Sequence, residues 1–183
     1  MGYFMRTMYL MISVIGLVAM SACTPAPKSA LGKSDIESDA AAAMAKAKTN
    51  DPTIVKIFDS ASGYAIFPSI GKGAAGVGGA YGKGVLYERG LAVGYCDVSQ
   101  ASIGFQLGGQ SYTEIIAFET QHAVDTFKQG NYRFDGQATA VALKSGAGTN
   151  AKFTDGVAVF TMDESGLMYE ASLGGQKFSY QAR

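Results

Sequence analysis

The chain has 183 residues, no Trp, one His and equal numbers of basic and acidic side chains, 15 of each, so its formal net charge is zero. This length predicts one domain with a sizeable core rather than two large domains. A neutral chain lacks the basic stripe typical of nucleic-acid binders, and a single histidine excludes a metal site built from several histidines. We therefore expect no nucleic-acid partner, no metal site and no cofactor.

The first 22 residues resemble the signal peptide of a bacterial lipoprotein. Arg6 precedes an apolar run, and Met20-Ser21-Ala22-Cys23 resembles a lipobox. An uncleaved membrane anchor is the alternative, but residues 8–22 would extend roughly 22 Å as a helix, against the ~30 Å of a bilayer core. We therefore interpret residues 1–22 as a leader that is cleaved after Ala22, with acylation of Cys23.

The residues after Cys23 indicate where the domain begins and on which membrane it sits. Residues 23–33 contain two prolines and small residues, which predicts a flexible tether, and the folded domain is expected over residues 34–183. Thr24, rather than Asp, follows the cysteine. This resembles the signal for sorting to the bacterial outer membrane, with the lipid-anchored domain facing the periplasm.

Three helices are predicted from capping signals. Ser34-Asp35-Ile36-Glu37 reads as a capping box, which predicts a helix that begins at Ser34. Asp51-Pro52 predicts a second helix, because Asp caps helices and Pro is tolerated at the first helical position. A short third helix is expected from Thr120 to Lys128, with an end at Gly130.

The rest of the chain reads as sheet. Glycines gather between Gly71 and Gly84, where helix is disfavoured and a glycine-rich hairpin is expected. Strands are predicted at residues 64–67, ended by Pro68, and at 85–87, 91–98, 103–107, 112–118, 157–162, 167–173 and 177–180, with a turn at 163–166. The predicted fold is α+β: an antiparallel, curved or barrel-like sheet with two N-terminal helices and one short inserted helix.

Catalytic motifs are weak in this sequence. Residues 71–76 satisfy GxGxxG, but no helix can follow them and no acidic residue lies at the required spacing, so a hairpin is the better interpretation. His122 has carboxylates at helical spacings, yet a histidine on a helix surface is favoured over a catalytic pair. The carboxylates, Glu114 among them, are expected on the solvated surface, and Cys96 as a small buried apolar group. We predict no catalytic residue.

Lys72 and Lys83 make the glycine-rich segment locally basic. A basic residue near an anionic membrane contributes ~1 kcal/mol, so both lysines are candidate lipid-binding residues. The alternative is that they keep an edge hairpin soluble and unpaired.

A further pattern consists of several spaced blocks: residues 63–68, the glycine-rich run to Gly84, Arg89-Gly90, 103–110 and 114–118. In this order the blocks resemble the SYLF domain, a lipid-binding family also described as actin-regulator-like in yeast, and the resemblance continues to about Ser172. Many members carry Trp where this chain has Tyr95 or Cys96. The resemblance implies membrane lipid binding, with phosphoinositides and actin machinery as partners of eukaryotic members. For a bacterial envelope we expect affinity for anionic phospholipid instead.

The sequence therefore favours a non-enzymatic, lipid-anchored envelope protein whose SYLF-like domain binds membrane phospholipid. The alternative is an interaction or structural module with an envelope protein partner, for which the acyl chains on Cys23 supply all membrane attachment. An enzyme acting on envelope polymers is a third hypothesis, and only His122 and scattered carboxylates support it.

Overall fold

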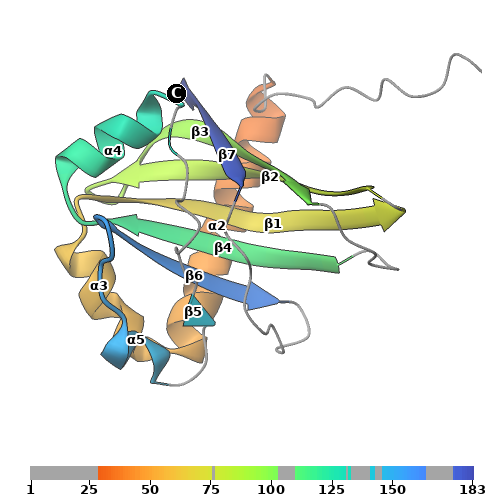
Figure 1. Ribbon diagram of the computed structural model, residues 1–183. Coiled ribbons are helices and arrows are strands. Elements are labelled where there is room, and N and C mark those ends of the chain that lie inside the picture. Colours follow the sequence, from red (N-terminus) through yellow and green to blue (C-terminus); the bar gives the residue numbers. More distant parts are fainter. Residues whose placement is uncertain are drawn as a thin grey trace, which may run out of the picture.

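The computed structural model describes residues 29–75, 77–102, 110–130, 132, 141–142, 146–163 and 175–183. They form an α+β fold built on one seven-stranded sheet, as predicted (Figure 1). The helices are α2 (Ala30–Asn50), the 3-10 turn η1 (Pro52–Ile54), α3 (Val55–Ser60), α4 (Gln121–Lys128) and α5 (Ala147–Asn150). The strands are β1 (Gly63–Ala75), β2 (Val77–Glu88), β3 (Leu91–Ser102), β4 (Gln110–Phe118), β5 (Val141–Ala142), β6 (Val157–Asp163) and β7 (Gln176–Ala182).

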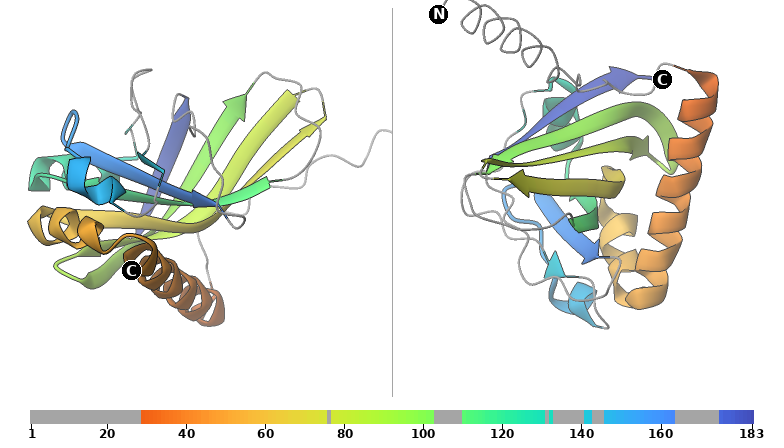
Figure 2. Two further views of the ribbon diagram at one scale, coloured as in Figure 1. Left: turned by 90° about the horizontal axis from the view of Figure 1, so that it is seen from below. Right: turned by 90° about the vertical axis from the view of Figure 1, so that its right-hand side faces the viewer.

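The sheet is open rather than closed into a barrel. Its strand order is β5-β6-β4-β1-β2-β3-β7, so the described strands end in β5 on one side and β7 on the other (Figure 2). All neighbours pair antiparallel except the short β5, which runs parallel to β6. The curved antiparallel sheet of the prediction is confirmed, and its barrel-like alternative is not. The predicted strands at residues 103–107 and 167–173, and the turn residues 164–166, lie outside the described residues.

The glycine-rich hairpin is confirmed, but its first strand runs further than predicted. β1 continues through Pro68 to Ala75, because the register shifts between Ile66 and Ser69 and this bulge accommodates a residue without an N–H. Close backbone contacts explain two glycines of β2: a Cβ at Gly84 would lie 2.5 Å from the carbonyl oxygen of Ile66, and one at Gly82 would lie 2.7 Å from Ile70 Cγ1.

The first helix begins earlier than the predicted capping box. α2 starts at Ala30, and the Ser29 hydroxyl caps it by accepting a hydrogen bond from the Gly32 N–H at 3.1 Å. Ser34 therefore lies inside the helix. Glu37 turns to the sheet instead, where its carboxylate accepts a hydrogen bond from the Tyr95 hydroxyl at 2.6 Å. The capping-box prediction was wrong because Ser29 already caps the helix five residues before Ser34.

The sheet buries apolar side chains on both faces. We call the face covered by α2 and α3 the α2 face, and the opposite one the α4 face. The alternation of side chains along each strand divides the core into two clusters. The cluster on the α2 face includes Ala40, Ala43, Ala47, Phe58, Ile66, Val85, Tyr95, Ile115 and Phe160. The cluster on the α4 face includes Phe67, Leu86, Cys96, Tyr112, Ile116, Phe118, Val124, Phe127 and Phe178.

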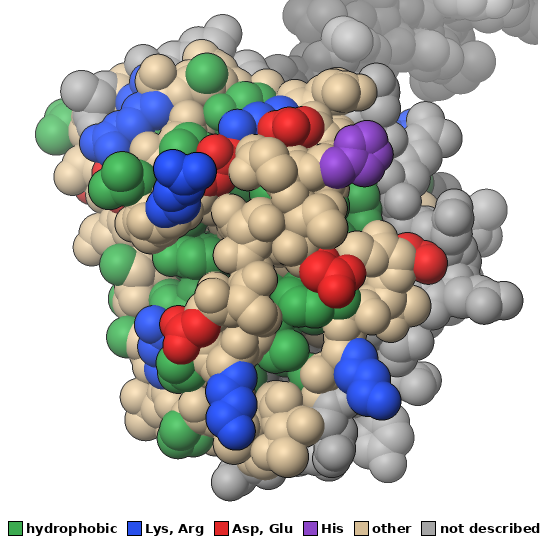
Figure 3. All heavy atoms as spheres, turned by 90° about the vertical axis from the view of Figure 1, so that its left-hand side faces the viewer, with side chains coloured by type: hydrophobic (Ala, Val, Ile, Leu, Met, Phe, Trp, Pro, Cys, Tyr) green, Lys and Arg blue, Asp and Glu red, His purple; other side chains and the backbone are tan. Residues whose placement is uncertain are grey.

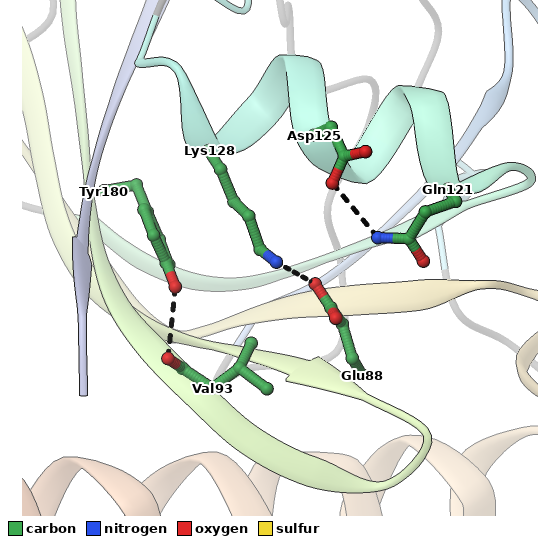
Figure 4. Close-up of polar contacts among 6 residues, drawn as sticks. All are labelled: Glu88, Val93, Gln121, Asp125, Lys128 and Tyr180. Atoms are coloured by element: carbon green, nitrogen blue, oxygen red, sulfur yellow. Dashed lines mark hydrogen bonds and ion pairs between the residues drawn. The ribbon is translucent and has the colours of Figure 1, made fainter.

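α4 lies where the sequence predicted it and is held at both ends. The Thr120 hydroxyl caps it by accepting from the Ala123 N–H, and Gly130 follows it with a φ of 71°. Lys128 in its last turn forms an ion pair with Glu88 of β2 (Figure 4). The predicted buried residues Ala123, Val124 and Phe127 all face the core.

Candidate functional site

Of the two lysines proposed from the sequence, the structure describes the side chain of Lys83. Lys83 of β2 pairs in register with Asp97 of β3, and Tyr81, two residues before it, belongs to the same face. The backbone of Lys72 in β1 pairs in register with Ala80, and its side chain lies outside the described part of the chain. Ala22 and Cys23 lie outside the described residues.

A hollow of about 510 Å³ lies between α2 and the sheet, and we call it the α2 hollow. Its walls are residues from one side of the helix and from the middle of the three neighbouring strands. They are Ile36, Asp39, Ala42, Ala43 and Lys46 of α2, Pro68 and Ser69 of β1, Tyr81, Gly82 and Lys83 of β2, and Thr113 of β4.

Two features of the sequence create this hollow. The buried residues of α2 are Ala40, Ala43 and Ala47, whose short side chains leave space beside the helix, and Ile36 and Met44 pack partly buried against the same core. The bulge at Pro68 lies at the hollow, where the Thr113 hydroxyl donates a hydrogen bond to the Pro68 carbonyl at 2.8 Å. The lining that we call the apolar floor consists of Ile36, Ala42, Ala43 and Pro68, and polar groups of Ser69, Tyr81 and Thr113 lie beside it.

The charges at the hollow are mixed but contain two cations. Lys46 is exposed on α2, Lys83 is half-buried on β2, and Asp39 lies two helical turns before Lys46. Neither lysine forms an ion pair within the described part of the chain. Asp97, the cross-strand neighbour of Lys83, accepts hydrogen bonds from Tyr81 at 2.9 Å and Ser179 at 3.2 Å. Two ammonium groups beside an apolar floor suit an anion that carries an apolar part.

Sequence reasoning did not find Lys46 as a site residue. It lies 37 positions before Lys83, and only the path of α2 across the sheet brings the two to one hollow. In the local sequence, Lys46 stands out only as a basic residue in an alanine-rich segment.

A buried polar cluster on the α4 face corrects another prediction. Glu114 was expected at the solvated surface, but it is fully buried, and Gln176 Nε2 donates a hydrogen bond to its Oε2 at 2.9 Å. Burial, followed by the Glu114 charge, raises the pKa of Tyr112. The alternation Tyr112, Glu114, Ile116, Phe118 carried the signal, because it places Glu114 on the same face as three apolar residues.

Asp51 is fully buried and joins the N-terminal helices to the segment at α5. Its carboxylate accepts from the Thr53 N–H and hydroxyl, from the Gly146 N–H and, at 2.6 Å, from the Gly148 N–H. Burial alone would raise the pKa of Asp51, but these hydrogen bonds outweigh it and hold the pKa below its usual value. The predicted cap at Asp51 is confirmed, and its second role was not foreseen.

Cys96 and His122 are the two other residues with side chains that could take part in catalysis. Cys96 is a buried free thiol whose pKa is raised, first by burial and then by Asp97, so the predicted apolar role is confirmed. His122 is exposed on α4, and Figure 3 shows the histidine among single charged and apolar side chains on the face that carries α3 and α4. In the described ranges, no three His, Cys, Asp or Glu side chains gather as a metal site would require.

None of the helices that the structure describes combines the length and the apolar character needed to span a bilayer.

The fold and the hollow define a class of protein: a small α+β domain with an open antiparallel sheet, crossed by an N-terminal helix that leaves a cationic hollow beside it. Residues 99–182 match the family model described as Ysc84, Las17-binding protein actin regulator. This match confirms the resemblance to the SYLF domain found in the sequence, over the C-terminal part of the chain.

The chain also has a curated relative in a bacterium. The chain is similar to Beta cell expansion factor A of Aeromonas veronii, with 29% identity over 137 residues, which cover 74% of this chain and 52% of the relative. The chain thus spans about half the length of the curated relative that it matches.

Proposed function

We propose that this protein is a lipid-anchored component of a bacterial envelope whose SYLF domain binds anionic phospholipid and carries out no catalysis. The observation that carries the proposal is the α2 hollow, where Lys46 and Lys83 flank an apolar floor. The match of residues 99–182 to a family associated with lipid binding supports it. The leader resemblance adds cleavage after Ala22, acylation of Cys23 and a place on the outer membrane facing the periplasm.

Two lysines give only a modest affinity for anionic lipid. The lipid anchor makes this affinity sufficient, because it holds the domain close to the membrane. Each basic side chain near an anionic surface contributes ~1 kcal/mol, so Lys46 and Lys83 together strengthen binding roughly 30-fold. A protein held to the membrane through a short tether experiences an effective lipid concentration in the millimolar range. A weak site on the domain would therefore be occupied whenever the anchor is in place.

Lipid binding by the domain itself must be measured without the anchor, because acylation of Cys23 would hold the protein on the membrane in any case. A Cys23→Ser chain, purified without acylation, is mixed with vesicles of neutral phosphatidylcholine alone or with a third of phosphatidylglycerol, and flotation is measured. We expect flotation with the anionic vesicles that falls as salt is raised, since exposed charges are screened. Background flotation with both kinds of vesicle would overturn the proposal.

A second candidate function rests on the α4 face. Phe127 lies 5.0 Å from Phe118 and 5.4 Å from Phe178, centroid to centroid, so aromatic rings fill the described part of this face. Such packing favours an interaction module with an envelope protein partner over a carrier that encloses its ligand in the interior. Cross-linking in cells separates the two, because this candidate predicts specific protein adducts that persist in a chain unable to bind vesicles.

A further inference from the structure

Two glycines of the long hairpin are not explained by the packing of the chain itself. Gly71 in β1 and Gly79 in β2 are exposed, and neither has a positive φ. A Cβ at Gly71 would meet nothing within 4 Å, and a Cβ at Gly79 would approach only the Gln100 carbonyl oxygen, at 3.5 Å. Gly82 and Gly84 differ, since a Cβ there would lie under 3.0 Å from neighbouring atoms. Glycine weakens a strand. A glycine at a position where a side chain would fit therefore indicates a surface that is kept open for a bound molecule.

These glycines extend the floor of the α2 hollow. Gly71 pairs in register with Tyr81, which lines the hollow, and Gly79 lies two residues before Tyr81 on the same face of β2. Figure 1 shows β1 and β2 running beyond the point where α2 crosses the sheet, so the helix does not cover this part of the face. We call the surface at Gly71 and Gly79 the glycine strip.

The chemistry of the glycine strip suits an apolar chain. β1 is paired with β2 and β4 at Gly71, and β2 is paired with β1 and β3 at Gly79. The ladder hydrogen bonds engage their backbone N–H and C=O groups in the plane of the sheet, so the surface exposed above it consists mainly of Cα–H groups. Another strand cannot add to a β1 or β2 edge here, because both edges are occupied. An occupant must lie on the face.

We propose that the glycine strip seats one acyl chain of a membrane phospholipid whose phosphate lies between Lys46 and Lys83. The lysines supply the charge complementarity, Ile36, Ala42 and Pro68 supply apolar lining in the hollow, and Tyr81, which pairs in register with Gly71, links the hollow to the strip. This inference rests on the proposed function and makes it specific. The domain holds a single lipid partly lifted out of the bilayer, whereas surface attraction alone would leave the lipid in place.

The first test fills the glycine strip with side chains and leaves Lys46 and Lys83 unchanged. Gly71→Val and Gly79→Val are introduced into the Cys23→Ser chain, and binding of monomeric dihexanoyl phosphatidylglycerol and of glycerol phosphate is measured by calorimetry. The unsubstituted chain is expected to bind the lipid at least tenfold more tightly than glycerol phosphate, and the Val variants are expected to lose that difference. Their melting temperature should be equal or higher, because Val favours strands and has room here.

Failure of this inference is distinct from failure of the proposed function. If the Val variants bind the short lipid as tightly as the unsubstituted chain, the acyl seat is wrong, although flotation with anionic vesicles would still support the proposed function. Equal affinity of the unsubstituted chain for glycerol phosphate and the lipid would also overturn the seat. Gln181→Val serves as the control, since Gln181 is exposed on β7 and is not among the residues that line the hollow.

A second measurement does not depend on the Val variants folding. The chain has no Trp, so Tyr81→Trp introduces a single indole at the start of the strip. Lipids with brominated acyl chains should quench its fluorescence. Tyr180→Trp, whose register partner Cys96 belongs to the α4 face, is the control and should not be quenched. Equal quenching of the two, or none at Tyr81→Trp, would overturn the proposal.

Discussion

The two faces of the sheet are packed in different ways, and the difference locates the binding surface. On the α4 face large rings interlock, with Phe67 and Phe178 at 5.7 Å and Phe118 and Phe127 at 5.0 Å between ring centroids. On the α2 face rings pack at α3, where Phe58 and Phe160 lie 5.9 Å apart, but the buried residues of α2 itself are alanines. Rings fill the space between elements, whereas alanines leave a hollow beside the helix. We therefore expect stability to depend mainly on the α4 face and lipid binding on the α2 face.

The largest effect should come from the α4 face. Phe127→Ala removes a fully buried ring that contacts Phe118 and Phe178, and it should lower the free energy of unfolding by about 3–5 kcal/mol. Urea unfolding measures this loss. At temperatures where the variant stays folded, its vesicle affinity should match that of the parent chain. A weaker vesicle affinity in the folded variant would contradict the assignment of lipid binding to the α2 face alone.

The next largest effect is expected at Asp51, which ties η1 to α5. Asp51→Asn removes a charged acceptor of four hydrogen bonds and should cost about 3 kcal/mol at pH 7. Because the pKa of Asp51 is lowered in the folded state, its stabilising effect is present above the unfolded pKa of about 4 and is lost as the pH falls through the folded value.

The pH dependence of urea unfolding provides the check for Asp51. The difference in unfolding free energy between parent and Asp51→Asn should narrow as the pH is lowered from 7 towards 3. A difference that stays constant over this range would show that the charge of Asp51 does not contribute to stability.

A smaller effect is expected where α2 is attached to the sheet. Tyr95→Phe removes the hydroxyl that donates to Glu37 at 2.6 Å and should lower the unfolding free energy by about 1.5 kcal/mol. Thermal unfolding measures the loss. Tyr180→Phe is a useful comparison, because its hydroxyl donates to a neutral acceptor, the Val93 carbonyl, and should cost less. Equal losses would indicate that the charge of Glu37 adds nothing.

The sequence predicted those parts of the fold whose signals are local. Thr120 and Gly130 mark both ends of α4, and Asp51-Pro52 marks the start of η1. The start of α2 was misplaced, because Ser34 and Glu37 have the spacing of a capping box although Ser29 provides the actual cap. β1 was ended too early at Pro68, since a bulge that tolerates proline leaves no mark in the sequence.

The candidate site depends on packing that the local sequence does not show. Lys83 of the glycine-rich hairpin lines the hollow, and Lys46 joins it there from a position 37 residues earlier, while the lipid-binding role of Lys72 and Lys83 stays a prediction. The bulge between Ile66 and Ser69 and the path of α2 bring the residues of the hollow together. Both are consequences of tertiary packing, which local spacing does not encode.

The most direct test of the central claim compares two lysines of the same helix. Lys46 lines the hollow, while Lys48 is exposed two residues further along α2 and is not among its lining residues. In the Cys23→Ser chain, Lys46→Gln should weaken binding to anionic vesicles by about 1 kcal/mol, roughly fivefold, and Lys48→Gln should weaken it much less. Equal losses for the two variants would contradict a lipid site at the α2 hollow.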